Sequence, residues 1–133
     1  PFFNLTEQKP YFKGGNYSGK RIPLVPDFKY ATGFVLQPVK GLTFSTELNH
    51  LGAQYAINDE PNNQPKVKPY TTVDMKVRYQ WRGATAWLSL INLFNEKYSD
   101  YATYGFNSST SQNEVAYYPA EGRNLIAGFS LEY

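Results

Sequence analysis

The sequence contains no cysteine, one methionine, one histidine and two tryptophans among its 133 residues. The absence of cysteine excludes a disulfide framework and a thiolate metal site, and a single histidine, His50, excludes a zinc site built on histidines. No apolar run approaches the roughly 20 residues that a transmembrane helix needs. Lys and Arg are scattered singly and the net charge is only +2, so the chain lacks the basic patch that binds nucleic acid.

Aromatic residues, in contrast, are unusually frequent. They make up 17% of the chain, with 12 Tyr and 9 Phe, beside many Asn, Ser, Thr and Gln. A water-soluble core of this size would use more Leu, Ile and Val. The length is that of one domain, and because the chain opens on Pro1 rather than Met, we expect a piece of a longer protein.

Apolar and polar residues alternate over most of the chain. In VDMKVRYQW, residues 73–81, every odd-numbered residue is apolar or aromatic and every even-numbered one is charged or polar. A period of two residues predicts a β-strand with two different faces. The pattern recurs, with Trp87, Ile91 and Ile126 as exceptions, and no segment has a helical period. We therefore predict an all-β chain of up-and-down antiparallel strands at residues 27–38, 42–55, 70–82, 84–98 and 122–133.

The connections between these strands alternate in length. PVKG joins the first pair and RG joins the third and fourth strands, whereas residues 56–69 and 99–121 form long loops. In an up-and-down sheet, all short turns then share one end and all long loops share the other. Outer-membrane β-barrels have this asymmetry, with short periplasmic turns and long extracellular loops. The strands also reach the length of about nine to eleven residues that crosses a bilayer.

Several aromatic residues lie where strands would enter and leave a bilayer. Tyr79 and Trp81 precede a short turn, and Tyr70 and Tyr98 lie near the long-loop end. Membrane interfaces select such residues because the ring is apolar while its hydroxyl or indole N–H reaches water. We predict these four as membrane-interface aromatics. The alternative is that Tyr and Phe are frequent here because they favour any sheet.

Four segments carry a family resemblance. In order and spacing, GKRIPLVPDFKY, PYTTVDMKVRY, LINLFNEKY and YYPAEGRNLIAGFSLEY resemble the C-terminal part of TonB-dependent outer-membrane receptors, over nearly all of residues 19–133. The resemblance implies that residues 1–133 supply about the last five strands of a 22-stranded transmembrane β-barrel, as an open piece. Residues 1–18 would add an upstream strand end. The separate plug domain of such receptors would be absent from the chain.

The chain ends inside a predicted strand, on an aromatic residue. In the family that it resembles, the last strand pairs with the first to close the barrel, and its terminal residues are a signal for the outer-membrane assembly machinery. The resemblance assigns this barrel-assembly signal to Leu125, Phe129, Leu131 and Tyr133. The alternative is an ordinary edge strand without a signal.

The long loops carry residue types suited to ligand binding. With Tyr133 at the periplasmic rim, both loops are extracellular, where these receptors capture their ligands. Tyr and Phe supply rigid contact area, and Asn and Gln supply adaptable hydrogen bonds. The ligand-loop candidates are Tyr101, Tyr104, Phe106, Tyr117, Tyr118, Asn62, Asn63 and Gln64. The alternative for each aromatic residue is that it only packs the loops together or belongs to the membrane interface.

Other polar clusters favour simpler interpretations. Asp59 and Glu60, near several Asn residues, suggest a calcium site, but their spacing is not that of an EF-hand. Charged residues on one strand face predict a lattice of cross-strand ion pairs along a wet lumen. These residues are Lys29, Glu47, Asp74, Lys76 and Arg78. Nothing places a catalytic base beside an orienting acid, so we predict no enzyme activity, no bound metal and no cofactor.

The resemblance implies a receptor in the outer membrane of a Gram-negative bacterium. It would take up a metal chelate, driven by TonB–ExbB–ExbD acting on the missing plug, with a ferric siderophore as the first choice and a corrinoid as the second. Its other partners would be outer-membrane lipid and the barrel assembly machinery. The isolated chain has two open sheet edges and is expected to self-associate. The alternatives are a secreted soluble β-sandwich that binds carbohydrate and a passive porin or adhesin barrel.

Overall fold

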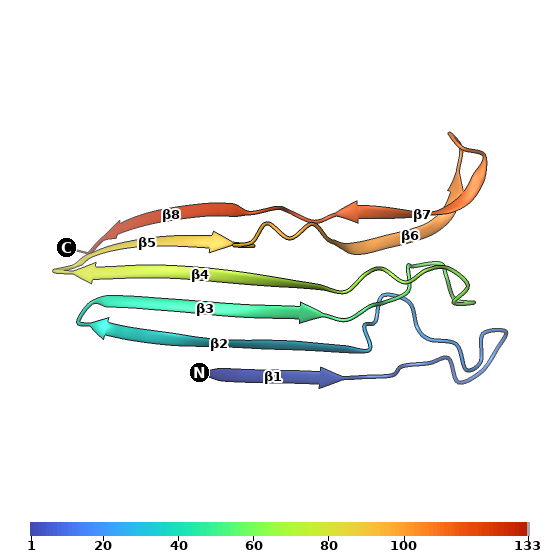
Figure 1. Cartoon of the computed structure of the whole chain (residues 1–133), viewed down its shortest axis with the longest axis horizontal. Coiled ribbons are helices and arrows are strands. Elements are labelled where there is room, and N and C mark those ends of the chain that lie inside the picture. Colours follow the sequence, from blue (N-terminus) through green and yellow to red (C-terminus); the bar gives the residue numbers. More distant parts are fainter. Residues whose placement is uncertain (133) are drawn as a thin grey trace.

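The computed structural model describes residues 1–132, and all of their regular secondary structure is β. Six strands form one antiparallel sheet in the order β1-β2-β3-β4-β5-β8, and two form a separate hairpin, β6-β7 (Figure 1). The strands are β1 (Phe2–Glu7), β2 (Phe28–Val39), β3 (Leu42–Leu51), β4 (Tyr70–Trp81), β5 (Ala84–Ile91), β6 (Ser99–Asn107), β7 (Gln112–Pro119) and β8 (Asn124–Leu131). The predicted all-β, antiparallel fold with an open sheet is therefore confirmed.

Some strand boundaries differ from those that the sequence predicts. The strand predicted at 84–98 ends at Ile91, and the one predicted at 42–55 ends at Leu51. The predicted loop at 99–121 is not an open loop, because β6 and β7 pair with each other over most of it. The upstream strand end is β1, which pairs with β2 along its whole length, so the main sheet has six strands rather than five.

The β4–β5 turn shows why the short connections can be so short. Arg82 and Gly83 have φ angles of 44° and 78°. A two-residue type I′ turn requires positive φ at both central residues, and its twist matches that of the flanking strands. The turn therefore fixes the register, which continues without a break along the β4–β5 pair.

The register gives the six-stranded sheet two different faces, because residues directly opposite each other in antiparallel neighbours share a face. The face that we call apolar carries Phe34, Leu36, Leu42, Phe44, Leu48, Val73, Met75, Val77, Tyr79, Trp81, Leu88, Leu90, Leu125, Phe129 and Leu131. The face that we call polar carries Glu47, Asn49, Asp74, Lys76, Arg78, Gln80, Ser89 and Ser130. The sheet is a single layer, so large apolar side chains such as Phe129 are exposed.

The three apolar exceptions to the alternation lie together on the polar face. Trp87 is directly opposite Gly128, and Ile91 and Ile126 occupy neighbouring positions on the same side. A side chain at Gly128 would overlap the indole of Trp87. The ammonium group of Lys76 lies 5.1 Å from the centre of that ring. These three exceptions therefore form one apolar patch on the polar face, which also carries Val35 and Leu51.

The predicted lattice of cross-strand ion pairs is wrong. Glu47 is directly opposite Asp74, which is also acidic, and Lys76 and Arg78 are opposite uncharged residues. The ion pairs found among residues 1–132 are Lys9–Glu7, Arg21–Asp27 and Lys66–Asp27. None of them includes a residue of the predicted lattice, because the register sets Glu47 opposite Asp74 and places Lys76 and Arg78 opposite uncharged residues on both neighbouring strands.

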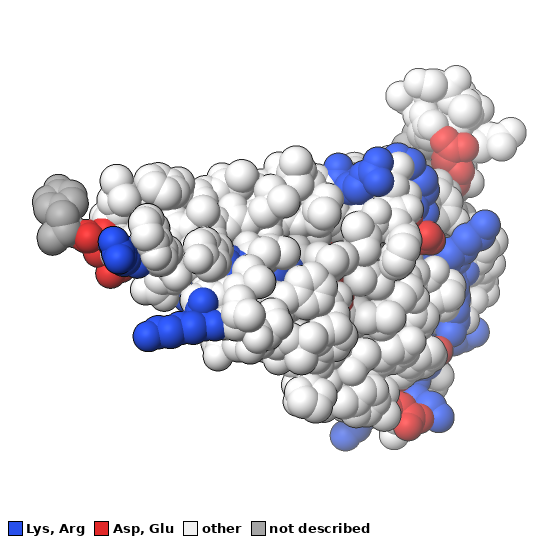
Figure 2. All heavy atoms as spheres, turned by 60° about the vertical axis from the view of Figure 1, so that its left-hand side comes forward, with Lys and Arg blue, Asp and Glu red and all other residues white. Residues whose placement is uncertain are grey.

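Fully buried apolar side chains lie in the connections rather than in the sheet. Ala56, Val67 and Ala102 are 0%, 3% and 0% exposed, and they pack against Val115. Figure 2 shows that the charged side chains visible on one face gather toward the two ends of the molecule, with largely uncharged surface between them. The sheet therefore has no buried apolar core of its own. Among residues 1–132, the only cluster of fully buried apolar side chains lies at one end of the molecule.

Candidate functional site

Three connections meet at the end of the sheet opposite the short turns (Figure 1). This region, which we call the loop end, consists of residues 8–27, 52–69 and 92–123. The N–H of Ile57 donates to the carbonyl oxygen of Ala102 (2.9 Å), and the N–H of Tyr104 donates to that of Ile57 (2.8 Å). Nε2 of Gln54 donates to the carbonyl oxygen of Asp100 (2.9 Å). The second connection is thus joined to the β6–β7 hairpin by backbone and side-chain bonds.

Asp59 organises the turn within the second connection. It is 1% exposed, and its two carboxylate oxygens accept the backbone N–H groups of Asn63 (2.9 Å) and Gln64 (3.1 Å). Among residues 1–132, no group of three acidic or histidine side chains could hold a metal ion. Both carboxylate oxygens of Asp59 are thus engaged by backbone N–H groups of its own turn. The side chain of Asn63 is exposed and that of Gln64 is half-buried.

Asn62 ties the second connection to the first. Its backbone has a φ of 56°, a left-handed conformation that Asn tolerates better than most residues. Its Oδ1 accepts the N–H of Arg21 (2.6 Å), and its Nδ2 donates to the carbonyl oxygens of Arg21 (3.0 Å) and Asp59 (3.1 Å). The amide of this ligand-loop candidate is thus engaged within the protein.

Asp27 makes a second tie between the same two connections. One carboxylate oxygen forms an ion pair with the guanidinium group of Arg21, and the other lies 3.1 Å from Nζ of Lys66. The ammonium group of Lys66 also lies 5.0 Å from the centre of the Tyr55 ring. Both cations are therefore directed at partners inside the loop end.

Three of the five aromatic candidates lie on one face of the hairpin. Tyr117 is opposite Ala102, and Tyr104 is opposite Val115. Because Ala102 and Val115 belong to the buried cluster, this face packs toward the second connection. Phe106 lies further along the same face and is 69% exposed, so it extends beyond the packed region.

The other two aromatic candidates lie on the opposite face of the hairpin. Tyr101 and Tyr118 are cross-strand partners, and their ring centres are 5.2 Å apart in an edge-to-face arrangement. They are 38% and 51% exposed. The structure therefore does not bring all five aromatic candidates into one surface.

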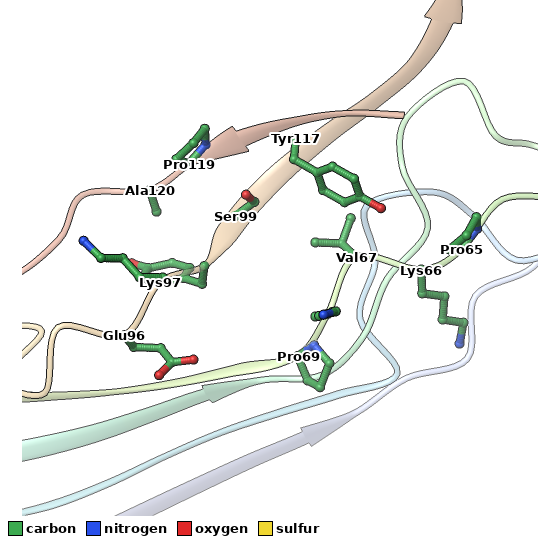
Figure 3. Close-up of a pocket in the computed structure, with 12 residues that line it drawn as sticks. Pro65, Lys66, Val67, Pro69, Glu96, Lys97, Ser99, Tyr117, Pro119 and Ala120 are labelled. Atoms are coloured by element: carbon green, nitrogen blue, oxygen red, sulfur yellow. The ribbon is translucent and has the colours of Figure 1, made fainter. Parts of the chain in front are cut away.

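A hollow of about 580 Å³ lies between the second connection and the base of the hairpin. Its walls are mostly apolar and include Pro65, Val67, Pro69, Tyr98, Tyr117 and Pro119. In Figure 3, the ring of Tyr117 points from β7 toward Val67, while the side chain of Lys66 extends away from the ring. Of the eight ligand-loop candidates, Tyr117 is the one that lines this hollow.

Tyr98 connects the hollow to the sheet. Its ring stacks on that of Tyr70 with the centres 3.9 Å apart. Burial raises the pKa of Tyr98, and the nearby carboxylate of Asp100 adds to the effect. The unbroken β3–β4 register places Tyr70 on the polar face, opposite in direction to Tyr79 and Trp81. The four predicted membrane-interface aromatics therefore do not lie on one face of the sheet.

A family model described as "TonB dependent receptor-like, beta-barrel" matches residues 2–93, more than half of the chain. The chain belongs to the TonB-dependent receptor family. A search of curated proteins found no match. Among residues 1–132 there is no helix of the length and apolarity needed to span a membrane.

Among solved structures, the chain is similar to the ferric yersiniabactin uptake receptor FyuA from Yersinia pestis. The two are 26% identical with a TM-score of 0.57, and the alignment covers 85% of this chain and 17% of that receptor. The predicted membership of the family is confirmed, and the chain is a segment of the barrel of a TonB-dependent receptor. The soluble β-sandwich alternative is wrong, because the matching family model is that of a β-barrel.

In a TonB-dependent receptor barrel, the apolar face of the sheet meets lipid and the polar face meets the lumen. Tyr79 and Trp81 lie on the apolar face near the short turns and are 49% and 58% exposed. The guanidinium group of Arg82 lies 5.1 Å from the Trp81 ring. Apolar rings beside a cation at a strand end suit a membrane interface.

The predicted barrel-assembly residues that the structure describes share this apolar face. Leu125, Phe129 and Leu131 are opposite Leu90, Ala86 and Ala84 of β5 and are 61%, 67% and 62% exposed. Tyr133, the fourth predicted residue, lies outside the described residues. Their placement is that of lipid-facing residues on an edge strand, and their role as a signal remains a prediction.

The sequence identified neither the hollow nor its proline-rich wall. The wall is built from residues 65–69 and 96–99 together with Tyr117, Pro119 and Ala120. These segments are far apart in the chain and have no common pattern. The repeated Pro65 and Pro69 around Val67 were the one local signal, because Pro restricts the backbone and keeps its ring rigid. Tyr98 was predicted at the membrane interface rather than at a ligand site.

Proposed function

We propose that this chain is the C-terminal part of the barrel of a receptor for energised uptake of a ferric siderophore. Its family membership, together with its similarity to a ferric yersiniabactin uptake receptor, is the observation that supports the proposal most. The complete barrel would have about 22 strands, and a plug domain would lie elsewhere in the longer protein. A corrinoid is the second candidate ligand.

In this proposal the loop end is extracellular and contributes one wall of the ligand site. The hollow beside Tyr117 has the volume of common small-molecule sites, roughly 300–1,000 Å³. Its proline and tyrosine walls suit an apolar or aromatic portion of a chelate, since rigid rings give contact area at little entropic cost. Asn63 and Gln64 directly precede Pro65 of this wall in the chain, and in this proposal their side chains add polar contacts to the ligand.

The other roles follow from the proposed place in the receptor. Uptake is driven by TonB–ExbB–ExbD acting through the plug. Leu125, Phe129, Leu131 and Tyr133 are read by the barrel assembly machinery. Outer-membrane lipid covers the apolar face, where large side chains such as Leu125, Phe129 and Leu131 are exposed.

The test uses the full-length receptor in a bacterial strain without other ferric-chelate receptors. Uptake of radioactive iron is measured for ferric catecholate, hydroxamate and phenolate chelates, each with and without TonB, and cobalamin uptake is measured in parallel. TonB-dependent uptake of at least one ferric chelate supports the proposal. Cobalamin uptake without iron uptake would establish the second candidate, and uptake that persists without TonB would contradict both.

A further inference from the structure

The β6–β7 hairpin leaves the main sheet at a break in the strand pairing. The β5–β8 ladder stops at Ile91 opposite Asn124, and pairing resumes only at Ser99 opposite Pro119. Between these points, one backbone bond, from the N–H of Ala120 to the carbonyl oxygen of Tyr98 (3.0 Å), crosses the gap. The two turns at this break are residues 92–98 and 120–123. Because strand pairing does not hold them together, the direction of the hairpin depends on their side-chain contacts.

Asn92 occupies the centre of this break and is 2% exposed. Its N–H donates to Oδ1 of Asp74 on β4 (2.8 Å). Its Oδ1 accepts the N–H of Glu96 (2.8 Å), and its Nδ2 donates to the carbonyl oxygens of Glu96 (3.0 Å) and Glu121 (3.4 Å). One residue thus joins the first turn, the second turn and the barrel wall.

Asn95 makes the second bridge between the two turns. Its Oδ1 accepts the N–H of Arg123 (3.0 Å), and its own N–H donates to the carbonyl oxygen of Asn92 (2.8 Å). A side chain at Gly122 would come within 2.9 Å of that Oδ1, so glycine allows the close approach. The segments NLFNEKY and GRN, which are distant in the sequence, therefore meet here.

Both asparagines also have left-handed backbones, with φ of 52° at Asn92 and 55° at Asn95. Most residues are strained in this region, whereas Asn tolerates it and glycine adopts it freely. The positions thus need two properties at once: a left-handed backbone and a short amide that both donates and accepts. Asparagine is the side chain that provides both.

We propose that Asp74, Asn92 and Asn95 are positioning residues for ligand capture, because they set the angle at which the hairpin leaves the barrel and so hold Tyr117 against the hollow. This inference rests on the proposed function of the loop end. The hairpin extends about 30 Å from the break at the usual rise per strand residue, so a small change of angle at its base displaces its far end by several ångströms. The bonds from Ile57 to β6 hold its flank, whereas Asp74 and the two asparagines hold its base.

The alternative is that the three residues stabilise the fold locally without directing the hairpin. The two possibilities differ in what a variant changes. Loss of a directing contact alters the orientation of the hairpin and its contact with ligand in a receptor that is still folded. Loss of a purely stabilising contact lowers the unfolding temperature and leaves both the orientation and the affinity of the folded receptor unchanged.

The variant of choice is Asn92→Gly in the full-length receptor. Glycine keeps the left-handed backbone and the N–H bond to Asp74, and it removes only the amide side chain. The matched control is Asn58→Gly, because Asn58 has a φ of 66° and its amide makes one long bond, to the carbonyl oxygen of Tyr104 (3.4 Å). Asp74→Ala removes the carboxylate that accepts the N–H of Asn92, whereas Asp74→Asn retains an acceptor oxygen for it.

The first readout is the distance between spin labels at Ser109, at the hairpin tip, and Ser130, in β8, measured by pulsed electron resonance in detergent. We expect Asn92→Gly and Asp74→Ala to broaden this distribution, and Asn58→Gly and Asp74→Asn to leave it as in the unmodified receptor. An unchanged distribution in Asn92→Gly and Asp74→Ala, measured on folded receptor, would overturn the inference.

The second readout is affinity for the ferric chelate that the uptake assay identifies. We expect Asn92→Gly to weaken binding by about tenfold, which corresponds to the net contribution of one or two buried hydrogen bonds. An affinity within twofold of the unmodified receptor together with a broadened distance would show that the hairpin does not position the ligand, and the inference would be wrong. If the unmodified receptor binds no chelate, the proposed function fails, while the distance measurement still tests the orientation.

Discussion

The sheet and the loop end of this molecule are held together in different ways. The sheet is a single layer whose apolar face carries exposed side chains such as Phe129, and backbone pairing joins its strands. The loop end has a buried cluster around Ala56 and Ala102 and many side-chain hydrogen bonds. In most domains, apolar side chains are removed from water by packing against one another. In this sheet, lipid must cover them instead. The barrel wall therefore depends on the lipid around it, whereas the loop end depends on its own contacts.

The largest expected effect comes from removing those surroundings. The isolated chain of residues 1–133 should form oligomers or aggregates without detergent, because its apolar face and the edges formed by β1 and β8 are uncovered. Light scattering after size-exclusion, with far-UV circular dichroism, measures this with and without detergent. A monodisperse, β-rich monomer in plain buffer would show that the sheet needs no lipid.

A charge on the apolar face should have the next largest effect. Leu88→Lys in the full-length receptor is expected to destabilise the barrel by about 2–4 kcal/mol, as measured for lysine near the bilayer midplane in outer-membrane barrels. Ser89→Lys is the matched control, since Ser89 is the next residue and lies on the polar face. Its cost should stay below about 1 kcal/mol, mostly from repulsion by Lys76 on the opposite strand. Equal losses of free energy of unfolding in the two variants would contradict the assignment of the faces.

Overfilling the buried cluster should affect the loop end alone. Ala102 is completely buried, so Ala102→Leu is expected to cost about 1–3 kcal/mol in overpacking. Hydrogen exchange should become faster in β6, β7 and the second connection and stay unchanged in β2 to β4. Uniformly faster exchange across the sheet would mean that the two regions unfold as one unit.

The smallest expected effect is a difference in chelate affinity between variants of two neighbouring tyrosines. Tyr117→Ala should weaken chelate binding by the full-length receptor by about tenfold, a typical result for a buried aromatic contact. Tyr118→Ala should change it by less than about twofold, because Tyr118 is on the opposite face of the hairpin. Isothermal titration on both variants distinguishes them, and a larger loss in Tyr118→Ala would place the ligand on the other face.

The sheet could be predicted from the sequence and the loop end largely could not. Residues alternate in β2, β3 and β4 because one face of the sheet meets lipid. The type of each residue therefore predicts the face on which it lies. The strand predicted at 84–98 was too long because the apolar residues Leu93 and Phe94 continue past Asn92, where a left-handed backbone ends β5. That conformation depends on Asp74, Glu96 and Glu121, which no local pattern brings together.

The hairpin was missed for a related reason. The residues of β6 and β7 alternate weakly, since Ala102 is small where it is buried and Tyr117 and Tyr118 are aromatic on both faces. A segment with aromatic rings on both faces lacks the period of two residues, so the sequence predicts a ligand loop rather than strands. The packed side is shown by the burial of Ala102 and Val115 against Ala56 and Val67 of the second connection, and such contacts between distant segments are not encoded in periodicity.

The contact between Trp87 and Gly128 bears on the free cross-section of the passage that the complete barrel encloses. A tryptophan on the inner wall would ordinarily obstruct it. Because its partner on β8 is Gly128, which has no side chain, the indole of Trp87 lies over the backbone of that strand. Any larger residue at position 128 would displace the ring from this place, so the glycine limits how far Trp87 reaches into the passage.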